Sequence, residues 1–247
     1  MRQRESFPTQ YLKRSYRRNI LKNNLTSYQV TVRETDLFVS SDVELKQAAL
    51  SSVHRHRAQL EAYIASHPDF LTALSPLKSD ALAPDIVRDM LQVARLAGVG
   101  PMAAVAGAMA QHVGLDLLSL THNVIVENGG DIFLKCNMEV KIGIFAGESP
   151  LSHKLALRIR PEEMPIGICT SSATVGPSLS FGRADAACVK SKSASLADAA
   201  ATAVANRVKT KKDIKKALAF GAEIPGVLGL LIILGEELGA WGDLEFV

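Results

Sequence analysis

The amino-acid sequence predicts an α+β fold of antiparallel sheets and paired helices, on three observations. Short apolar segments follow one another as hairpins, for example in 28–41 and 123–135. Segments with the 3.6-residue period of a helix come in pairs, without the regular strand–helix alternation of a parallel fold. The chain has 247 residues and is 47% hydrophobic, which is enough to bury a sizeable core.

The first half begins with the segment 28–41, which alternates like two strands around a polar turn. Asp42 is expected to cap a helix that runs to about Ser66. Pro68 ends this helix, because the residue before a proline disfavours helical backbone. A proline-marked connector then leads to a second helix, which begins at Pro84.

A third helix is expected at 98–114, "GVGPMAAVAGAMAQHVG", because Pro101 suits a first helical position. Its body consists almost entirely of small residues, so it can approach a neighbouring helix or a ligand closely. Its N-terminus offers free N–H groups and the positive end of the helix dipole.

The second half is expected to contain further strands, an alanine-rich helix and a basic helix near 211–219. The apolar segment 224–235 is interpreted as a buried strand, followed by a final strand. An order of hairpin, paired helices and strands occurs in the first half and more loosely in the second. An internal pseudo-duplication is therefore one interpretation.

Positive charge is concentrated in two places. Residues 1–22 carry seven basic residues against one glutamate, and 209–216 carry five lysines against Asp213. We divide the chain into a basic N-terminal arm, 1–27, and one domain, 28–247. The basic segments could contact RNA, a membrane or an anionic ligand, or could simply be solvated. Nucleic acid is not the expected partner, because 5% aromatic residues are too few for a base-stacking surface.

Cys136, Cys169 and Cys188 have no CxxC spacing and are expected to be reduced core residues, not disulfide or zinc ligands. The N-terminus lacks the apolar segment of a signal peptide. The segment 224–235 is too short to span a membrane. These features predict a soluble, cytoplasmic protein that has no membrane partner.

The segment "ENGGD", 127–131, is the first of three candidate functional segments. Gly129 and Gly130 permit positive φ angles or a close approach of the backbone to a ligand. Asn128 and Asp131 place an amide and a carboxylate on either side. An ordinary β-turn explains the same residues, because Asn-Gly is a common hairpin signal.

The second candidate is "TSSATVGPSLSFG", 170–182, which has six hydroxyl side chains within eleven residues. Hydroxyl groups and turn N–H groups can together bind an anion. A polar surface loop is the alternative. The candidate ligand-binding residues in this segment are Thr170, Ser171, Ser172 and Thr174.

The third candidate is "SLADAAATAVANR", 195–207, in which Asp198, Thr202 and Asn206 would share one face of a helix. A carboxylate beside a hydroxyl oxygen suits a hard cation such as Mg²⁺, which keeps waters and bridges phosphates. In the alternative, Ser195 caps the helix with Asp198 in a capping box, and no metal is involved.

The chain resembles an uncharacterised cytoplasmic branch of the ApbE-like superfamily from about Tyr28 to the C-terminus. The resemblance is carried by "ETDL", "VGPMAAVAGAMA", "VENGGDI", "CTSSATVG", "SLSFGRADA" and "LADAAATAVAN". The best-known members are FAD:protein FMN transferases, formerly called thiamine biosynthesis lipoproteins. The resemblance implies a T-fold-like α+β fold, in which homo-oligomers are common.

The resemblance also implies site residues. The N-x-GGD turn, which lies at the flavin site of the transferases, is matched by 128–131. Their A-D-x-x-x-T motif, whose Asp and Thr bind Mg²⁺ at the pyrophosphate, is matched by Asp198 and Thr202. Their T-S-G loop is approximated by 170–172.

Two departures from the transferases stand out. The region after Ser172 lacks their His-containing segment ending in Asp-Pro, and Ala106 replaces the lysine of their A-K-G element.

The resemblance implies a Mg²⁺-dependent transferase or hydrolase acting on the pyrophosphate of FAD or a related nucleotide. Asp131, or another carboxylate, would accept the proton of the acceptor, which could be a protein. The alternatives are an enzyme for another small anionic metabolite, and a non-catalytic flavin- or ligand-binding oligomer.

Overall fold

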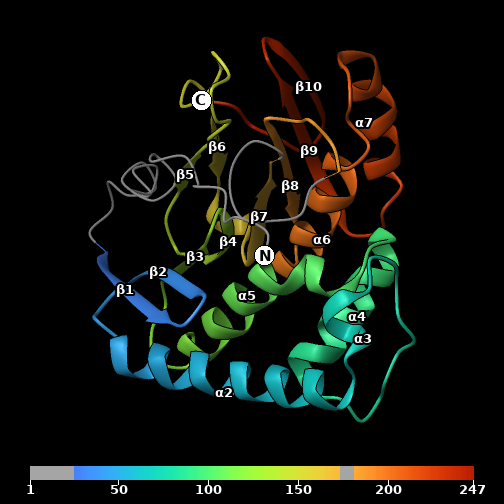
Figure 1. Ribbon diagram of the computed structural model, residues 1–247. Coiled ribbons are helices and arrows are strands. Elements are labelled where there is room, and N and C mark those ends of the chain that lie inside the picture. The colour runs from blue at the N-terminus through green and yellow to red at the C-terminus, as the bar shows by residue number, and fades with distance from the viewer. Residues whose placement is uncertain (1–24, 173–180) are drawn as a thin grey trace.

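The computed structural model describes residues 25–172 and 181–247, and Thr174 lies outside these ranges (Figure 1). The strands are β1 (Thr26–Val32), β2 (Thr35–Ser41), β3 (Val124–Asn128), β4 (Asp131–Lys135), β5 (Val140–Gly143), β6 (Ala156–Ile159), β7 (Ile166–Ser171), β8 (Ala186–Ser191), β9 (Val227–Leu234) and β10 (Glu237–Gly242). The helices are α2 (Lys46–Ser66), α3 (Asp69–Thr72), α4 (Asp85–Ala97), α5 (Val105–Leu117), α6 (Ala194–Ala205) and α7 (Ile214–Ala222). Short 3-10 turns precede two of them, η2 (Pro101–Ala104) before α5 and η4 (Lys211–Asp213) before α7, and η3 (Pro161–Glu163) precedes β7.

Eight strands form one antiparallel sheet in the order β1-β2-β3-β4-β7-β8-β9-β10. This confirms the predicted combination of helices with a large antiparallel sheet. A strand pair, helices and a second strand pair follow one another from β1 to β4, and again from β7 to β10. The strands β4 and β7 join the two halves in the middle of the sheet.

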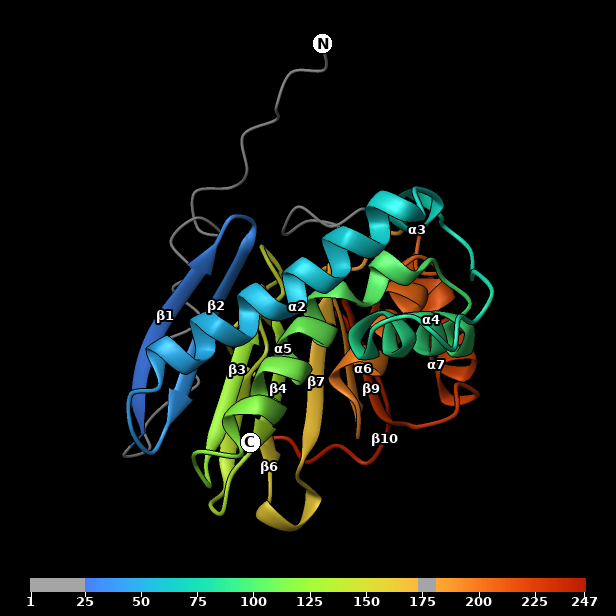
Figure 2. The same cartoon turned by 90° about the horizontal axis from the view of Figure 1, so that it is seen from below.

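Each face of the sheet is covered by a different layer. The helices α2, α5, α6 and α7 pack on one face, as Figure 2 shows for α2 and α5. The hairpin of β5 and β6 covers the other face with Val140, Ile142, Leu157 and Ile159. Because side chains alternate along a strand, Phe133 of β4 joins the helix-side core while Ile132 and Leu134 join the other.

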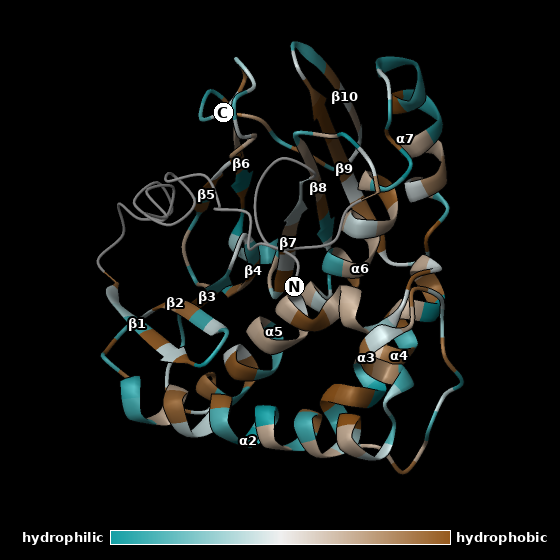
Figure 3. Cartoon of the chain, viewed as in Figure 1, coloured by the Kyte–Doolittle hydropathy of each residue, from teal (hydrophilic) through white to brown (hydrophobic). Residues whose placement is uncertain are grey.

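The central helices α5 and α6 pack against each other and against the middle strands. In Figure 3, α2 alternates between teal and brown, as expected for a helix with one solvent-facing side, whereas α5 is mostly pale to brown. All but one residue of α6 is buried. This arrangement puts the N-terminal half of α6 at the centre of the molecule.

The helix cap predicted at Asp42 is wrong. The helix begins at Lys46 and has no side-chain cap. The carboxylate of Asp42 instead accepts the N–H groups of His122 and Asn123, the hydroxyl of Thr121 and the Asn123 amide. These bonds tie the end of β2 to the start of its neighbour β3.

The alternative in which Ser195 caps the alanine-rich helix is excluded. The cap of α6 is Ser193, whose Oγ accepts the N–H of Leu196 at 3.1 Å. Ser195 is fully buried and donates its hydroxyl to Asp89 of α4 at 2.6 Å. The capping-box explanation for Asp198 therefore does not apply.

Among the described residues, no single helix is long and apolar enough to cross a membrane. One bent pair of segments, Asp85–Ala97 and Pro101–Leu117, reaches that length and composition only when the two are taken together.

Candidate functional site

The close contact between α5 and α6 depends on small residues. A Cβ on Gly107 would overlap the carbonyl oxygen of Ala194 and lie 2.7 Å from the Cβ of Asp198. A Cβ on Gly167 of β7 would collide with the backbone of Ala194 as well. Gly107 and Gly167 thus allow a close approach of helix to helix and of helix to strand. For Gly107 this agrees with the close approach predicted for the small-residue segment 98–114.

Asp198 faces the start of α5 from the first half of α6. Its Oδ2 accepts the N–H of Gly107 at 2.8 Å. Burial raises the pKa of Asp198 to about 7, and the N–H groups of Gly107 and Ala106 oppose this effect. Asp198 therefore stabilises the N-terminus of α5 as a carboxylate acceptor, while its buried position makes the charged form costly.

Asp131 is the first residue of β4 and pairs across the sheet with Cys169 of β7. Burial raises its pKa well above the usual range, and the nearby charge of Asp198 raises it further. Two buried carboxylates that repel each other can be accommodated by a shared proton or by a cation.

Cys169 lies beside this carboxylate pair without being a reactive thiol. Burial raises its pKa well above the usual range, and the charges of Asp131 and Asp198 act in the same direction. Its Sγ donates to the carbonyl oxygen of Ala194 at 3.3 Å. Since only the thiolate is a strong nucleophile, Cys169 serves packing, as its sequence context predicts.

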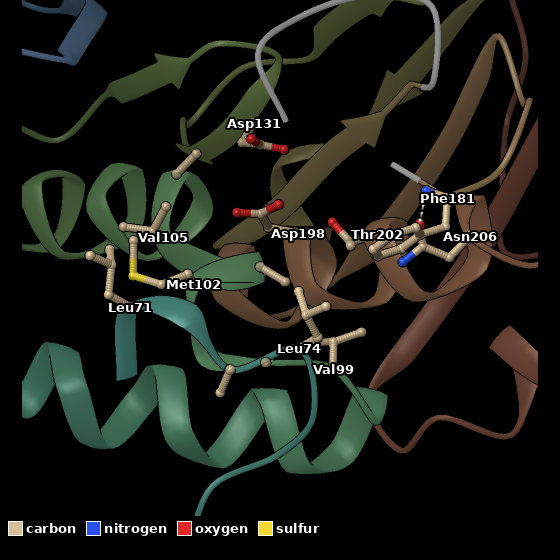
Figure 4. A pocket seen from close by; sticks show the side chains of 14 residues that line it. Leu71, Leu74, Val99, Met102, Val105, Asp131, Phe181, Asp198, Thr202 and Asn206 are labelled. Carbon is tan, nitrogen blue, oxygen red and sulfur yellow. Dashed lines mark hydrogen bonds between the residues drawn. The ribbon is translucent and has the colours of Figure 1, made fainter. Parts of the chain in front are cut away.

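Asp131 and Asp198 line one pocket of about 360 Å³ (Figure 4). Thr202 and Asn206 line it too, so the polar stripe predicted on one face of α6 is confirmed. Figure 4 shows the side chains of Asp198, Thr202 and Asn206 following one another along α6, with Asp131 reaching toward Asp198 from β4. None of the described residues lining this pocket is Lys, Arg or His.

The rest of the pocket wall is mostly apolar and was not predicted from the sequence. It comes from α3 and the residues that follow it, from the segment before α5 and the first turn of α5, and from Phe181. The apolar lining consists of Leu71, Ala73, Leu74, Val99, Gly100, Met102, Ala103, Val105, Ala106 and Phe181. The leucines of the proline-marked connector were the sequence signal that could have indicated this wall. Apolar residues in an otherwise polar connector suggest contact with another part of the molecule.

The NGGD turn adjoins the pocket, although only its Asp131 lines it. Gly129 and Gly130 have φ angles of 69° and 110°, and the N–H of Gly130 donates to Glu127 at 2.8 Å. Asn128 donates its amide to the carbonyl oxygen of Ala106 at 3.1 Å. The segment is therefore a true hairpin turn. The hydrogen bond from Asn128 also connects the turn, and with it Asp131, to the beginning of α5.

The described part of the hydroxyl-rich segment lies at the end of β7, next to the turn. A Cβ on Gly130 would be 3.7 Å from the carbonyl oxygen of Thr170. Ser171 is half-buried and Ser172 is buried, and neither lines the pocket. That Thr170, Ser171 and Ser172 contact a ligand therefore remains a prediction.

A cation at this site would have few protein ligands. Within the ranges 25–172 and 181–247, no group of three His, Cys, Asp or Glu side chains is placed to hold a metal ion. Two carboxylates and the hydroxyl of Thr202 are hard oxygen donors, which fits Mg²⁺. Such an ion keeps several waters and takes further ligands from phosphate oxygens, so a three-ligand protein cage is not required.

Comparison with proteins of known sequence finds relatives along almost the whole chain. A family model described as AbpE bacteria matches residues 18–238. A UPF0280 protein of Methanocella arvoryzae is 43% identical over 227 residues, covering 92% of this chain and 91% of its own. A UPF0280 protein of Methanocaldococcus jannaschii is 38% identical over 222 residues, covering 87% and 90%.

Two solved structures share the fold. The flavinyl transferase ApbE of Pseudomonas stutzeri, in its apo form, superposes with a TM-score of 0.59 at 15% identity, covering 88% of this chain and 94% of its own. The flavin transferase ApbE of Vibrio cholerae gives a TM-score of 0.57 at 11% identity, covering 89% and 97%. At such identities the similarity shows the fold alone.

Proposed function

This chain belongs to the family described as AbpE bacteria, and from that premise we propose that it is a Mg²⁺-dependent transferase or hydrolase acting on the pyrophosphate of FAD or a related nucleotide. One observation carries the proposal. Asp131 and Asp198 are buried side by side in a pocket whose described lining has no cationic side chain. Two buried carboxylates without a cationic neighbour in the described lining are costly unless a cation shares the site.

Asp198 and Thr202 would hold the ion from successive turns of α6. Mg²⁺ bound there would offset the negative charge on the phosphates and on the leaving group. The N–H of Gly107 keeps the Asp198 carboxylate in one orientation, so little side-chain freedom is lost when a ligand binds.

Asp131 would accept the proton of the attacking hydroxyl group. In the transfer, the acceptor oxygen bonds to the phosphorus nearer the riboflavin part, and the bond from that phosphorus to the bridging oxygen breaks. AMP leaves with the bridging oxygen, and the proton passes to Asp131. Its raised pKa supports this role, because a carboxylate in that environment binds a proton more readily. Water in place of the acceptor gives hydrolysis.

The test is the release of AMP from FAD by the purified chain with Mg²⁺, followed by chromatography. We expect Asp198→Asn and Asp131→Asn each to lower the rate by about 10²- to 10⁴-fold. Asp85→Asn is the matched control, because its carboxylate is exposed, lies outside the pocket and pairs with Arg88. A chain that binds no FAD would contradict the flavin version of the proposal.

Two alternatives are supported by particular observations. The absence of the transferases' histidine between Ser172 and Phe181 favours an enzyme for another small anionic metabolite. The bond between Gly107 and Asp198 favours a non-catalytic binding protein, because capping α5 needs no metal. The first predicts a thermal shift with a different anionic metabolite, and the second predicts unchanged ligand binding in Asp198→Asn.

The same proposal extends to architecture and setting. The repeated order of strand pair, helices and strand pair supports a T-fold-like pseudo-duplication. The solved flavin transferases of this fold support a flavin compound as the ligand. A protein is the acceptor that we propose. We further propose that the protein is cytoplasmic. We also propose that it forms a homo-oligomer, and gel filtration with light scattering would test the oligomeric state.

A further inference from the structure

The pocket extends along one face of α6, from a polar end with two carboxylates to an exposed aromatic side chain. Asp131 and Asp198 form the polar end, and Phe181 lies at the other beside Asn206 (Figure 4). Thr202 stands between these ends on the same helix face. Asp198 and Asn206 are eight residues apart, so the two ends are separated by about 12 Å along the helix axis.

Phe181 is an exposed aromatic side chain on a fixed backbone. The residue is 55% exposed, although it lines the pocket. Its N–H donates to Oδ1 of Asn206 at 2.8 Å. The chain then turns directly onto the end of α6, where a Cβ on Gly182 would overlap the carbonyl oxygen of Ala205, and the N–H of Arg183 donates to Val208 at 2.6 Å.

An exposed phenyl ring on a backbone bound in this way can stack on a planar ring of a ligand. Every planar ring system offers a face to an aromatic side chain, so stacking needs no matching hydrogen-bond donors. Because the backbone of Phe181 is already held, little conformational freedom remains to be lost on binding. Phe181 is also the one aromatic residue among the described residues that line the pocket.

We infer that Phe181 is the platform for the ring at one end of the ligand and that Asn206 is the residue that positions it. This inference rests on the proposed function, since it assumes that phosphates occupy the polar end. A ligand that reaches from the carboxylates to Phe181 must then carry a ring on a linker of sugar or ribityl length. The ligand class is a nucleotide with a planar ring, and bare pyrophosphate would fill the polar end alone.

The test compares the affinities of FAD and inorganic pyrophosphate, each with Mg²⁺, by calorimetry on the full chain. Phe181→Ala and Phe181→Leu should weaken FAD binding by roughly 10- to 100-fold and leave pyrophosphate binding unchanged. Phe181→Tyr should restore FAD binding, because it keeps the ring. Leu82→Ala is the control, since Leu82 is an exposed apolar residue outside the pocket.

Asn206 has its own readout. Asn206→Ala should weaken FAD binding without weakening pyrophosphate binding, whereas Asn206→Asp keeps an oxygen acceptor for the Phe181 N–H and should restore it. An equal loss for both ligands would show a merely structural role and overturn the inference. If FAD binds and Phe181→Ala does not weaken it, the inference fails while the proposed function stands. If the unmodified chain binds neither ligand, the proposed function is wrong and the inference that rests on it is wrong as well.

Discussion

The N–H of Gly107 donates to Oδ2 of Asp198 at 2.8 Å, although the two residues are 91 positions apart in the chain. Gly107 also has no room for a Cβ, because Ala194 and Asp198 of α6 occupy that space. The contact between the two central helices and the orientation of the site carboxylate therefore depend on the same glycine. Mutations here should affect stability and ligand binding together.

Gly107→Ala is expected to destabilise the fold by about 1–3 kcal/mol, because the added methyl group must displace the backbone of α6. It should also weaken the Mg²⁺ response, since Asp198 moves with the helix. Urea unfolding with and without Mg²⁺ measures both. Gly98→Ala is the control, because its φ of 72° is unfavourable but its surroundings are open, so a loss of about 1–2 kcal/mol without any change in the Mg²⁺ response is expected.

Stability without a divalent cation should fall as the pH rises from about 4 to about 7. Burial raises the pKa of Asp198 to about 7, so the folded chain binds this proton more tightly than the unfolded chain. The favourable contribution is complete below the unfolded pKa and disappears as the pH passes the folded one, at no more than about 1.4 kcal/mol per pH unit. Asp198→Asn should flatten this dependence in thermal unfolding followed from pH 4 to 8. An equal slope in the variant would contradict the assignment.

Mg²⁺ should raise the melting temperature, and more so at pH 8 than at pH 6, because the ion competes with the proton on Asp198. At an ion concentration of about 100 times the dissociation constant the gain is about 2.7 kcal/mol. Removal of the ion with EDTA should reverse the shift. The shift should be absent in Asp131→Asn combined with Asp198→Asn, and its persistence there would place the ion elsewhere.

Asp42 should show the opposite pH dependence. Hydrogen bonds from Thr121 and Asn123, the largest causes, lower its pKa to about 2. Its contribution is therefore present above the ordinary carboxyl pKa and is lost as the pH falls toward 2. Asp42→Ala should destabilise the chain at pH 7 by about 1 kcal/mol, since Asp42 is solvent-exposed and its bonds are screened. The difference from the unmodified chain should shrink as acid is added.

The two serines at the start of α6 should differ in their mutational cost. Ser193→Ala removes the helix cap and should cost about 1 kcal/mol. Ser195→Ala removes a buried donor to Asp89 and should cost about 1–3 kcal/mol, because a hydrogen bond to a half-buried carboxylate is lost. Urea unfolding of both variants distinguishes the two roles, and a silent Ser195→Ala would contradict the bond to Asp89.

Most elements of this fold could be predicted from the sequence because their signals are local. The strands flanking "NGG", the helix that begins after Pro84 and the apolar strand at 224–235 follow from periodicity and turn residues within a few positions. The alignment of Asp198, Thr202 and Asn206 on one side of α6 also follows from the helical period alone. The helix cap predicted at Asp42 was wrong and the alternative cap at Ser195 is excluded, because a capping side chain can find a stronger partner elsewhere in the fold.

The sequence by itself determined the elements, the polar stripe on α6 and the chemistry of its side chains, because these depend on neighbours within one or two helical turns. The tertiary structure alone decided that Asp131 lies beside Asp198, that both carboxyls are buried, and that Phe181 lies at the far end of the pocket. Those relations require β4 to pair with β7 and α6 to pack closely against α5. Proximity and desolvation arise from contacts between distant segments, and no local pattern encodes them.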